Sequence, residues 1–161
     1  PYHVWKDISR RIFNLSELEN TAEQKISFEK IVDADPDLRE RAPLLSAVLP
    51  FVIEDNESTK NISGDARANA MHQLVIERLA KKANETPTVL VIEDVHWLDS
   101  GSWALLNLAA QRISPLLIVL TFRPMGLQTP VEFNSIKNLA STRYLTLSPL
   151  SEMDIKTLLA Q

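Results

Sequence analysis

The chain has 161 residues, 45% hydrophobic and 24% charged, a balance typical of one soluble globular domain. Its net charge of −4 argues against nucleic-acid binding, and the lack of cysteine excludes disulfides and thiolate metal sites. The three histidines are scattered, so a histidine-based metal site is not expected. No apolar run approaches the roughly 18 residues that suggest a membrane span. We therefore expect a cytoplasmic domain without a membrane contact, and the start on Pro1 suggests a piece of a longer polypeptide.

The first part of the chain, residues 1–85, is predicted to be mainly helical. Apolar residues at helical spacing predict four helices: over 4–18, after a capping box at 21–24, from Asp35-Pro36-Asp37, and over 64–83. The buried face of the last helix is expected to carry Met71, Leu74, Val75 and Leu79. The polar stretch 54–63 predicts a loop.

The second part, residues 86–161, is predicted to alternate strands and helices. Strands are expected over 88–93, 116–122 and 143–149. Helices are expected from Asp99 or Ser100 to about 113, over 130–140, and after a capping-type start at 151–154. Because the first two strands are almost wholly apolar, they predict an α/β fold with a parallel sheet and helices on both faces.

Polar residues follow the two apolar strands at the point where each ends. Glu93 and Asp94 follow the first strand, and Thr121 and Arg123 follow the second. A right-handed crossover makes the strands parallel, so their carboxyl ends meet at the same edge of the sheet. Open α/β sheets bind ligands at that edge. The four residues therefore form the candidate site.

Adjacent carboxylates and an arginine favour one kind of chemistry. Two confined carboxylates repel each other, and Mg²⁺ relieves the repulsion because it prefers hard oxygen ligands and retains several waters. The second carboxylate can then orient or deprotonate a water. The arginine can donate several N–H groups to a phosphate. The set suits phosphoryl transfer to water.

These residues carry a family resemblance. The sequence VLVIED followed by VHWLDSGSWALL resembles the Walker B region of P-loop ATPases of the STAND and AAA type. It is most similar to the ATPase module beside class III adenylate/guanylate cyclase domains, which also occurs in large bacterial transcription regulators and signalling kinases. LLIVLTFRP resembles the next strand of that module, and YLTLSPLSEMDIKTLL resembles the strand and helix leading into its lid. PYHVWKDISRRIF and RAPLLSAVLP resemble earlier segments of the module.

The resemblance implies a single partial ATPase domain over 1–161 with a three-layer, P-loop-like sheet and with ATP and Mg²⁺ as cofactors. By position, Glu93 would face the magnesium ion through water, and Asp94 would be the base or water-orienting residue. Arg123, with Thr121, would sense the γ-phosphate. The implied function is a regulatory switch in signal transduction, coupled to cyclic-nucleotide synthesis or to transcription control. The other domains of the same polypeptide would be its partners.

One element of the pattern is missing. The P-loop motif Gly-x-x-x-x-Gly-Lys-Ser/Thr supplies backbone N–H groups and a lysine to the phosphates. Gly64, Gly101 and Gly126 do not fit it. In this family the loop precedes the segment that Pro1 begins, so the chain alone is expected to bind ATP weakly or not at all. Loss of upstream strands would expose a sheet edge, so pairing between copies is also expected.

Simpler interpretations stay open at each position. The acidic pair Glu93-Asp94 can be a solvated strand end, and Arg123 a surface salt-bridge residue. Trp97 is expected to fill core space, His96 to hydrogen-bond within a turn, and Asp99 to cap a helix.

Two other protein classes compete with an active ATPase. A degenerate ATPase fold could serve protein contacts without turnover. A response-regulator receiver also opens with paired acids, but only residues 95–161 follow the pair, and the next strand ends in Thr-Phe-Arg without an acid. We set the receiver aside.

Overall fold

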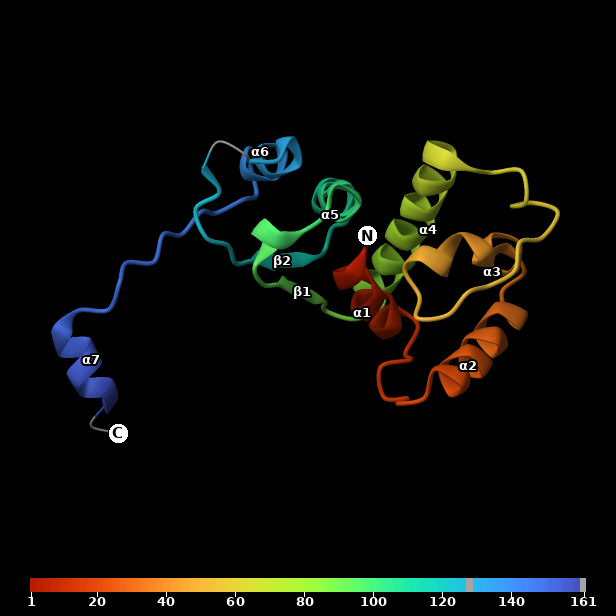
Figure 1. Ribbon diagram of the computed structural model, residues 1–161, viewed down its shortest axis with the longest axis horizontal. Coiled ribbons are helices and arrows are strands. Elements are labelled where there is room, and N and C mark those ends of the chain that lie inside the picture. Colours follow the sequence, from red (N-terminus) through yellow and green to blue (C-terminus); the bar gives the residue numbers. More distant parts are fainter. Residues whose placement is uncertain (127–128, 160–161) are drawn as a thin grey trace.

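The structure is a computed structural model that describes residues 1–126 and 129–159 (Figure 1). Its elements are, in chain order, α1 (His3–Ile12), α2 (Thr21–Asp33), α3 (Pro36–Arg41), the 3₁₀ turn η1 (Ala42–Ala47), α4 (Gly64–Glu85), β1 (Val89–Ile92), the 3₁₀ turn η2 (Val95–Trp97), α5 (Ser100–Arg112), β2 (Leu117–Leu120), α6 (Val131–Lys137) and α7 (Glu152–Leu159). The mainly helical first part and the strand-containing second part agree with the sequence prediction.

The first helix ends earlier than its hydrophobic pattern predicts. α1 stops at Ile12 rather than near 18, because Asn14 takes a left-handed conformation with φ of 54°. The N–H of Leu15 then donates to the carbonyl of Arg10, and the N–H of Asn14 donates to Arg11. This pair of bonds is the usual chain reversal at a helix C-terminus, and asparagine tolerates the left-handed position. The chain reversal places Leu15 in the hydrophobic core, where it is fully buried.

The next two helices begin at polar caps. Asn20, rather than the predicted box at Thr21, caps α2, because its side-chain oxygen accepts the N–H of Ala22 at 2.8 Å. Asp35 caps α3 as predicted and accepts the N–H of Leu38 at 3.0 Å. Each cap satisfies a backbone donor that the helix itself leaves free.

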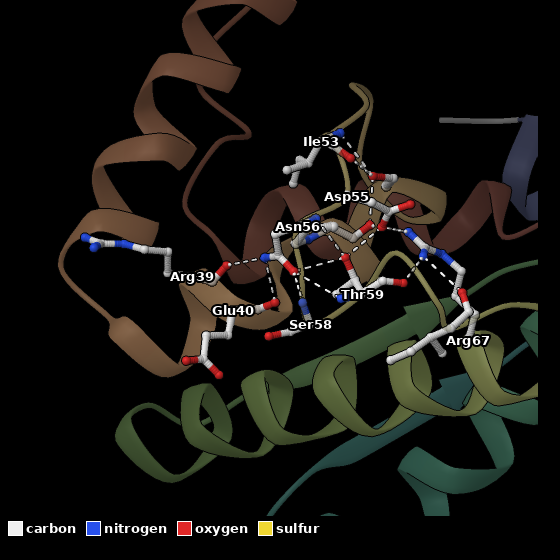
Figure 2. A network of polar contacts seen from close by, with 11 residues as sticks. Arg39, Glu40, Ile53, Asp55, Asn56, Ser58, Thr59 and Arg67 are labelled. Carbon is white, nitrogen blue, oxygen red and sulfur yellow. Dashed lines mark hydrogen bonds and ion pairs between the residues drawn. The ribbon is translucent and has the colours of Figure 1, made fainter.

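The loop at 54–63 is free of helix and strand, as predicted, but it is held by a polar network (Figure 2). Arg67 of α4 donates to Asp55 at 2.8 Å and to three backbone carbonyls. The side chain of Asn56 donates to the carbonyl of Glu40 and accepts the N–H of Thr59. The Thr59 hydroxyl and then Arg67 hold the pKa of Asp55 below its usual range.

One continuous core joins the helices to the inner face of the strands. The expected face of α4 is buried, and Trp5 and Trp103 are fully enclosed as core anchors. The largest enclosed side chains are Trp5, Phe28, Leu15, Leu38, Leu45, Leu49, Met71, Leu74, Ile92, Trp103, Leu105 and Leu106.

β1 and β2 form a two-stranded parallel sheet, in the register Val89 to Leu117 through Ile92 to Leu120. The predicted parallel pairing is therefore confirmed, and α5 makes the crossover between the strands. Helices cover one face only: Leu90 and Ile92 are buried, whereas the side chains that point the other way are exposed. The expected cover on both faces is wrong for the described residues, and a three-layer sheet is not formed. An apolar strand becomes buried on both faces only when a second layer of helices covers its other face.

The predicted third strand over 143–149 is wrong. The segment is extended but has no hydrogen-bonded strand partner, and Leu145 and Leu147 are exposed. A strand needs a neighbouring edge, so β-propensity without a partner does not produce one. The final helix does form as α7, which stands apart from the rest of the molecule (Figure 1). The side chain of Asp154, part of the expected capping start, lies outside the described residues.

Candidate functional site

The carboxyl ends of β1 and β2 are joined by hydrogen bonds that continue beyond the ladder. The N–H of Thr121 donates to the carbonyl of Ile92 at 3.1 Å, and the N–H of Val95 donates to the carbonyl of Thr121 at 2.9 Å. The N–H of Asp94 donates to the Thr121 hydroxyl at 3.2 Å. The two polar strand ends therefore lie side by side, as the parallel topology predicted.

Asp94 changes the direction of the chain at the end of β1. It adopts a left-handed conformation, with φ of 51° and ψ of 42°, which costs an L-residue energy and is best tolerated by aspartate and asparagine. The N–H of Trp97 donates to the Asp94 carbonyl at 2.9 Å and so closes η2. The Asp94 side chain is 65% exposed, and Glu93 is exposed as well. Both carboxylates thus reach solvent at the sheet edge.

The third predicted side chain of the site, Arg123, also points to solvent. Its guanidinium makes no hydrogen bond or ion pair within the described part of the chain, so the surface salt bridge considered for it does not form there. Its backbone N–H donates to His96 Nδ1 at 3.4 Å. An exposed guanidinium after β2 and two exposed carboxylates after β1 leave charged groups of both signs open to solvent at these strand ends.

His96 and Trp97 differ from each other in environment. The expected hydrogen bond of His96 within its own turn is not the one that forms: its Nδ1 accepts the N–H of Arg123, beyond β2, and its side chain is 14% exposed. Trp97 does not fill the core: it is 82% exposed, and its indole lies beside the His96 ring with centroids 5.1 Å apart. The prediction for Trp97 was wrong because η2 turns away from the core, where Val95 takes the buried position.

Asp99 caps α5, as predicted. Its carboxylate accepts the N–H of Ser102 at 3.0 Å and the Ser102 hydroxyl at 2.8 Å. It also accepts the N–H of Tyr2 at 2.9 Å, a contact that joins the start of the chain to the helix after the site. Burial acts to raise the pKa of Asp99, but these hydrogen bonds outweigh it and lower the pKa. No local sequence signal predicts the Tyr2 contact, because the two residues lie 97 positions apart.

The donor set suits a hydrated cation more than a protein-enclosed one. Among the described residues, no group of three or more histidines, cysteines or acids could hold a metal ion. Glu93 and Asp94 offer two neighbouring exposed carboxylates. Mg²⁺ commonly binds through one or two carboxylates and keeps waters or takes phosphate oxygens for its other positions. The residues present therefore fit Mg²⁺ bound together with a phosphate ligand.

Comparison with known families shows to which family the chain belongs. The sequence profile of the AAA ATPase domain family matches residues 8–119. The chain belongs to that family. The matched part of this AAA ATPase domain runs from α1 into β2, so it includes Glu93 and Asp94 and stops before Thr121 and Arg123.

One curated relative is similar to part of this chain. An uncharacterized protein of Rhizobium meliloti (strain 1021) is 36% identical over 74 residues, which are 45% of this chain and 7% of the relative. The chain thus spans a small fraction of the relative's length. The comparison with solved structures found no match to this chain. Within the part that the structure describes, no helix is both long and apolar enough to cross a membrane.

Proposed function

We propose that this AAA ATPase domain forms the acidic half of a Mg²⁺–ATP site in a regulatory ATPase. The observation that carries the proposal is the junction of the two strand ends, where Thr121 accepts the N–H of Asp94 through its hydroxyl and that of Val95 through its carbonyl. The junction brings a carboxylate pair and an arginine to one solvent-facing edge. Family membership supports nucleotide binding at such an edge.

Each residue has a proposed role that follows from its group and exposure. Glu93 would hold a magnesium ion through water, and Asp94 would orient or deprotonate the attacking water. Arg123 neutralises charge on the γ-phosphate, a role for which a guanidinium is well shaped. The Thr121 hydroxyl has two proposed roles. It fixes the backbone of Asp94 by accepting its N–H, and it lies near the γ-phosphate with Arg123.

The proposed setting is a longer signalling polypeptide. A glycine-rich loop in another part of that polypeptide would hold the phosphates, because the chain has 3 glycines and none lies in such a motif. The resemblance to modules beside nucleotide cyclase domains and in transcription regulators supports a switch that reports its nucleotide state to an output domain.

The test is the substitution Asp94→Asn in a polypeptide that supplies the glycine-rich loop. Loss of a general base typically costs about 10² to 10⁴ in rate, so we expect kcat for ATP hydrolysis to fall at least about 100-fold. ATP affinity, measured by calorimetry, should change little because Glu93 and Arg123 remain. Asp65→Asn, at an exposed aspartate in the first turn of α4, is the matched control and should leave kcat unchanged. Equal turnover in Asp94→Asn and wild type would remove Asp94 from the reaction.

A second candidate function is a non-catalytic interaction module. It is favoured by the exposed apolar face of the sheet and by the exposed indole of Trp97. This alternative predicts no ATP turnover in any polypeptide containing the chain, even when the glycine-rich loop is present. Hydrolysis that depends on Asp94 would exclude it.

A further inference from the structure

We propose that His96 is a positioning residue that holds the backbone of Arg123 beside Asp94. The inference rests on the proposed ATPase function, and it concerns how the two catalytic groups are kept together. His96 Nδ1 accepts the N–H of Arg123 at 3.4 Å and lies 3.9 Å from Asp94 Oδ1. One imidazole thus lies between the turn that follows β1 and the turn that follows β2.

The contact adds a bond where the sheet no longer provides one. The ladder and its extensions fix the backbone as far as Thr121, which exchanges bonds with Ile92 and Val95. Arg123 lies two residues further along, and its N–H is held by a side chain from the opposite turn instead of by a strand. Without His96, no described bond would tie the backbone of Arg123 to the β1 side of the edge.

The contact with Arg123 makes Nδ1 the accepting nitrogen of the His96 ring. A nitrogen that accepts an N–H offers a lone pair and carries no hydrogen, so the contact requires the ring hydrogen to be on Nε2. The ring is 14% exposed and tilted 40° against the Trp97 indole, which restricts its rotation.

His96 is not assigned a contact with nucleotide or water. It acts through two other residues. It fixes the backbone position from which the Arg123 side chain extends, and it lies next to the Asp94 carboxylate. Removing such a residue should reduce transition-state stabilisation while ground-state binding of ATP persists. The kinetic signature is a lower kcat with an unchanged KM.

Two substitutions separate the acceptor from the ring. His96→Phe keeps an aromatic ring against Trp97 and removes the acceptor. His96→Asn removes the ring and keeps a side-chain oxygen near the position of Nδ1. His3→Phe, at an exposed histidine of α1, is the matched control.

Amide hydrogen exchange followed by NMR on the chain tests the contact without nucleotide. In His96→Phe the Arg123 amide should exchange about fivefold faster, the effect of losing one net hydrogen bond. The Val95 amide, bonded to Thr121, should keep its protection and so report that the edge remains folded. His96→Asn and His3→Phe should leave the Arg123 amide near its wild-type rate. A nitrogen-15 spectrum of the wild-type imidazole should show the proton on Nε2. An unchanged Arg123 amide in His96→Phe, or a proton on Nδ1, overturns the proposal.

Steady-state ATP hydrolysis in a polypeptide with the glycine-rich loop tests the role in the reaction. We expect His96→Phe to lower kcat about fivefold or more at constant KM, and His96→Asn to restore most of it. Faster exchange at Arg123 with an unchanged kcat overturns the positioning role while leaving the proposed function intact. Absence of hydrolysis in the wild type overturns the proposed function. This failure can be told apart from failure of the His96–Arg123 contact, because the hydrogen-exchange experiment does not require turnover.

Discussion

Tyr2 joins three elements through single contacts of its backbone and side chain. Its N–H donates to Asp99 at the start of α5, and its hydroxyl lies 2.9 Å from His72 Nε2 on α4. A Cβ on Gly101 would lie 2.7 Å from the Tyr2 ring, so the absence of a side chain at Gly101 lets the ring lie close against the first turn of α5. Desolvation, then the Asp99 charge, raises the pKa of the Tyr2 hydroxyl. The residue thus ties the helical part to the helix that follows the candidate site.

His72 makes the stability of this contact depend on pH. Burial lowers its pKa below the usual 6.5, so the unfolded chain binds more protons than the folded chain as pH falls through that value. The stabilisation is fully present above about pH 6.5 and is lost as pH falls toward the folded pKa. We expect the free energy of unfolding, measured by urea denaturation, to decrease between about pH 7 and 5. His72→Gln should flatten this slope.

The control for the pH effect is His3→Gln, because His3 is exposed on α1. This variant should keep the wild-type slope. If His72→Gln and wild type lose stability in parallel over the same range, the slope arises from other groups and the assignment to His72 is wrong.

At the scale of elements, Arg67 anchors the loop at 54–63 to α4. Its guanidinium donates to the carbonyls of Pro43, Thr59 and Ile62 and to the carboxylate of Asp55. A lysine ammonium keeps the charge but lacks the planar fork that serves several acceptors at once. We expect Arg67→Lys to lower the free energy of unfolding by about 1 kcal/mol and to open the loop to limited proteolysis.

Arg11→Lys provides the comparison for Arg67, because Arg11 is exposed and its guanidinium has no described hydrogen bond. Its cleavage pattern should match the wild type. An Arg67→Lys loop that resists protease as well as the wild-type loop would mean that Asn56 and Thr59 hold it without the guanidinium.

How well an element could be predicted depended on whether its cause is local. The buried face of α4 follows from spacing alone, and Asp35 and Asp99 are caps because each precedes a helical pattern. The early end of α1 depends on one left-handed asparagine, which the apolar period of the helix does not register. The stretch at 143–149 has residues that favour strands but no neighbouring strand edge among the described residues. A local sequence pattern cannot show whether such a strand partner exists.

At the scale of the molecule, the outer face of the sheet is an unshielded apolar surface. Val89, Val91, Leu117 and Val119 are 57%, 56%, 59% and 40% exposed. Both strands are short, and each has one edge without a strand partner among the described residues. Exposed apolar faces and open edges favour association between chains.

We therefore expect the chain to self-associate in a concentration-dependent manner, measured by size-exclusion chromatography with light scattering. Val91→Lys places a charge on the outer sheet face and should shift the population toward monomer. Val52→Lys, at a residue that is 73% exposed away from the sheet, should have no such effect. A monomer at all concentrations in the wild type would contradict the prediction.

The sequence by itself determined the parts that depend on local pattern and on topology. It placed β1, β2 and α5, and the parallel crossover required Glu93, Asp94, Thr121 and Arg123 to lie at one edge. The tertiary structure alone decided which face of the sheet is covered, where Trp97 points, and that Tyr2 reaches Asp99 and His72. The physical reason is that hydrophobic periodicity shows which side of a segment is apolar. The neighbour that buries this side comes from distant parts of the chain.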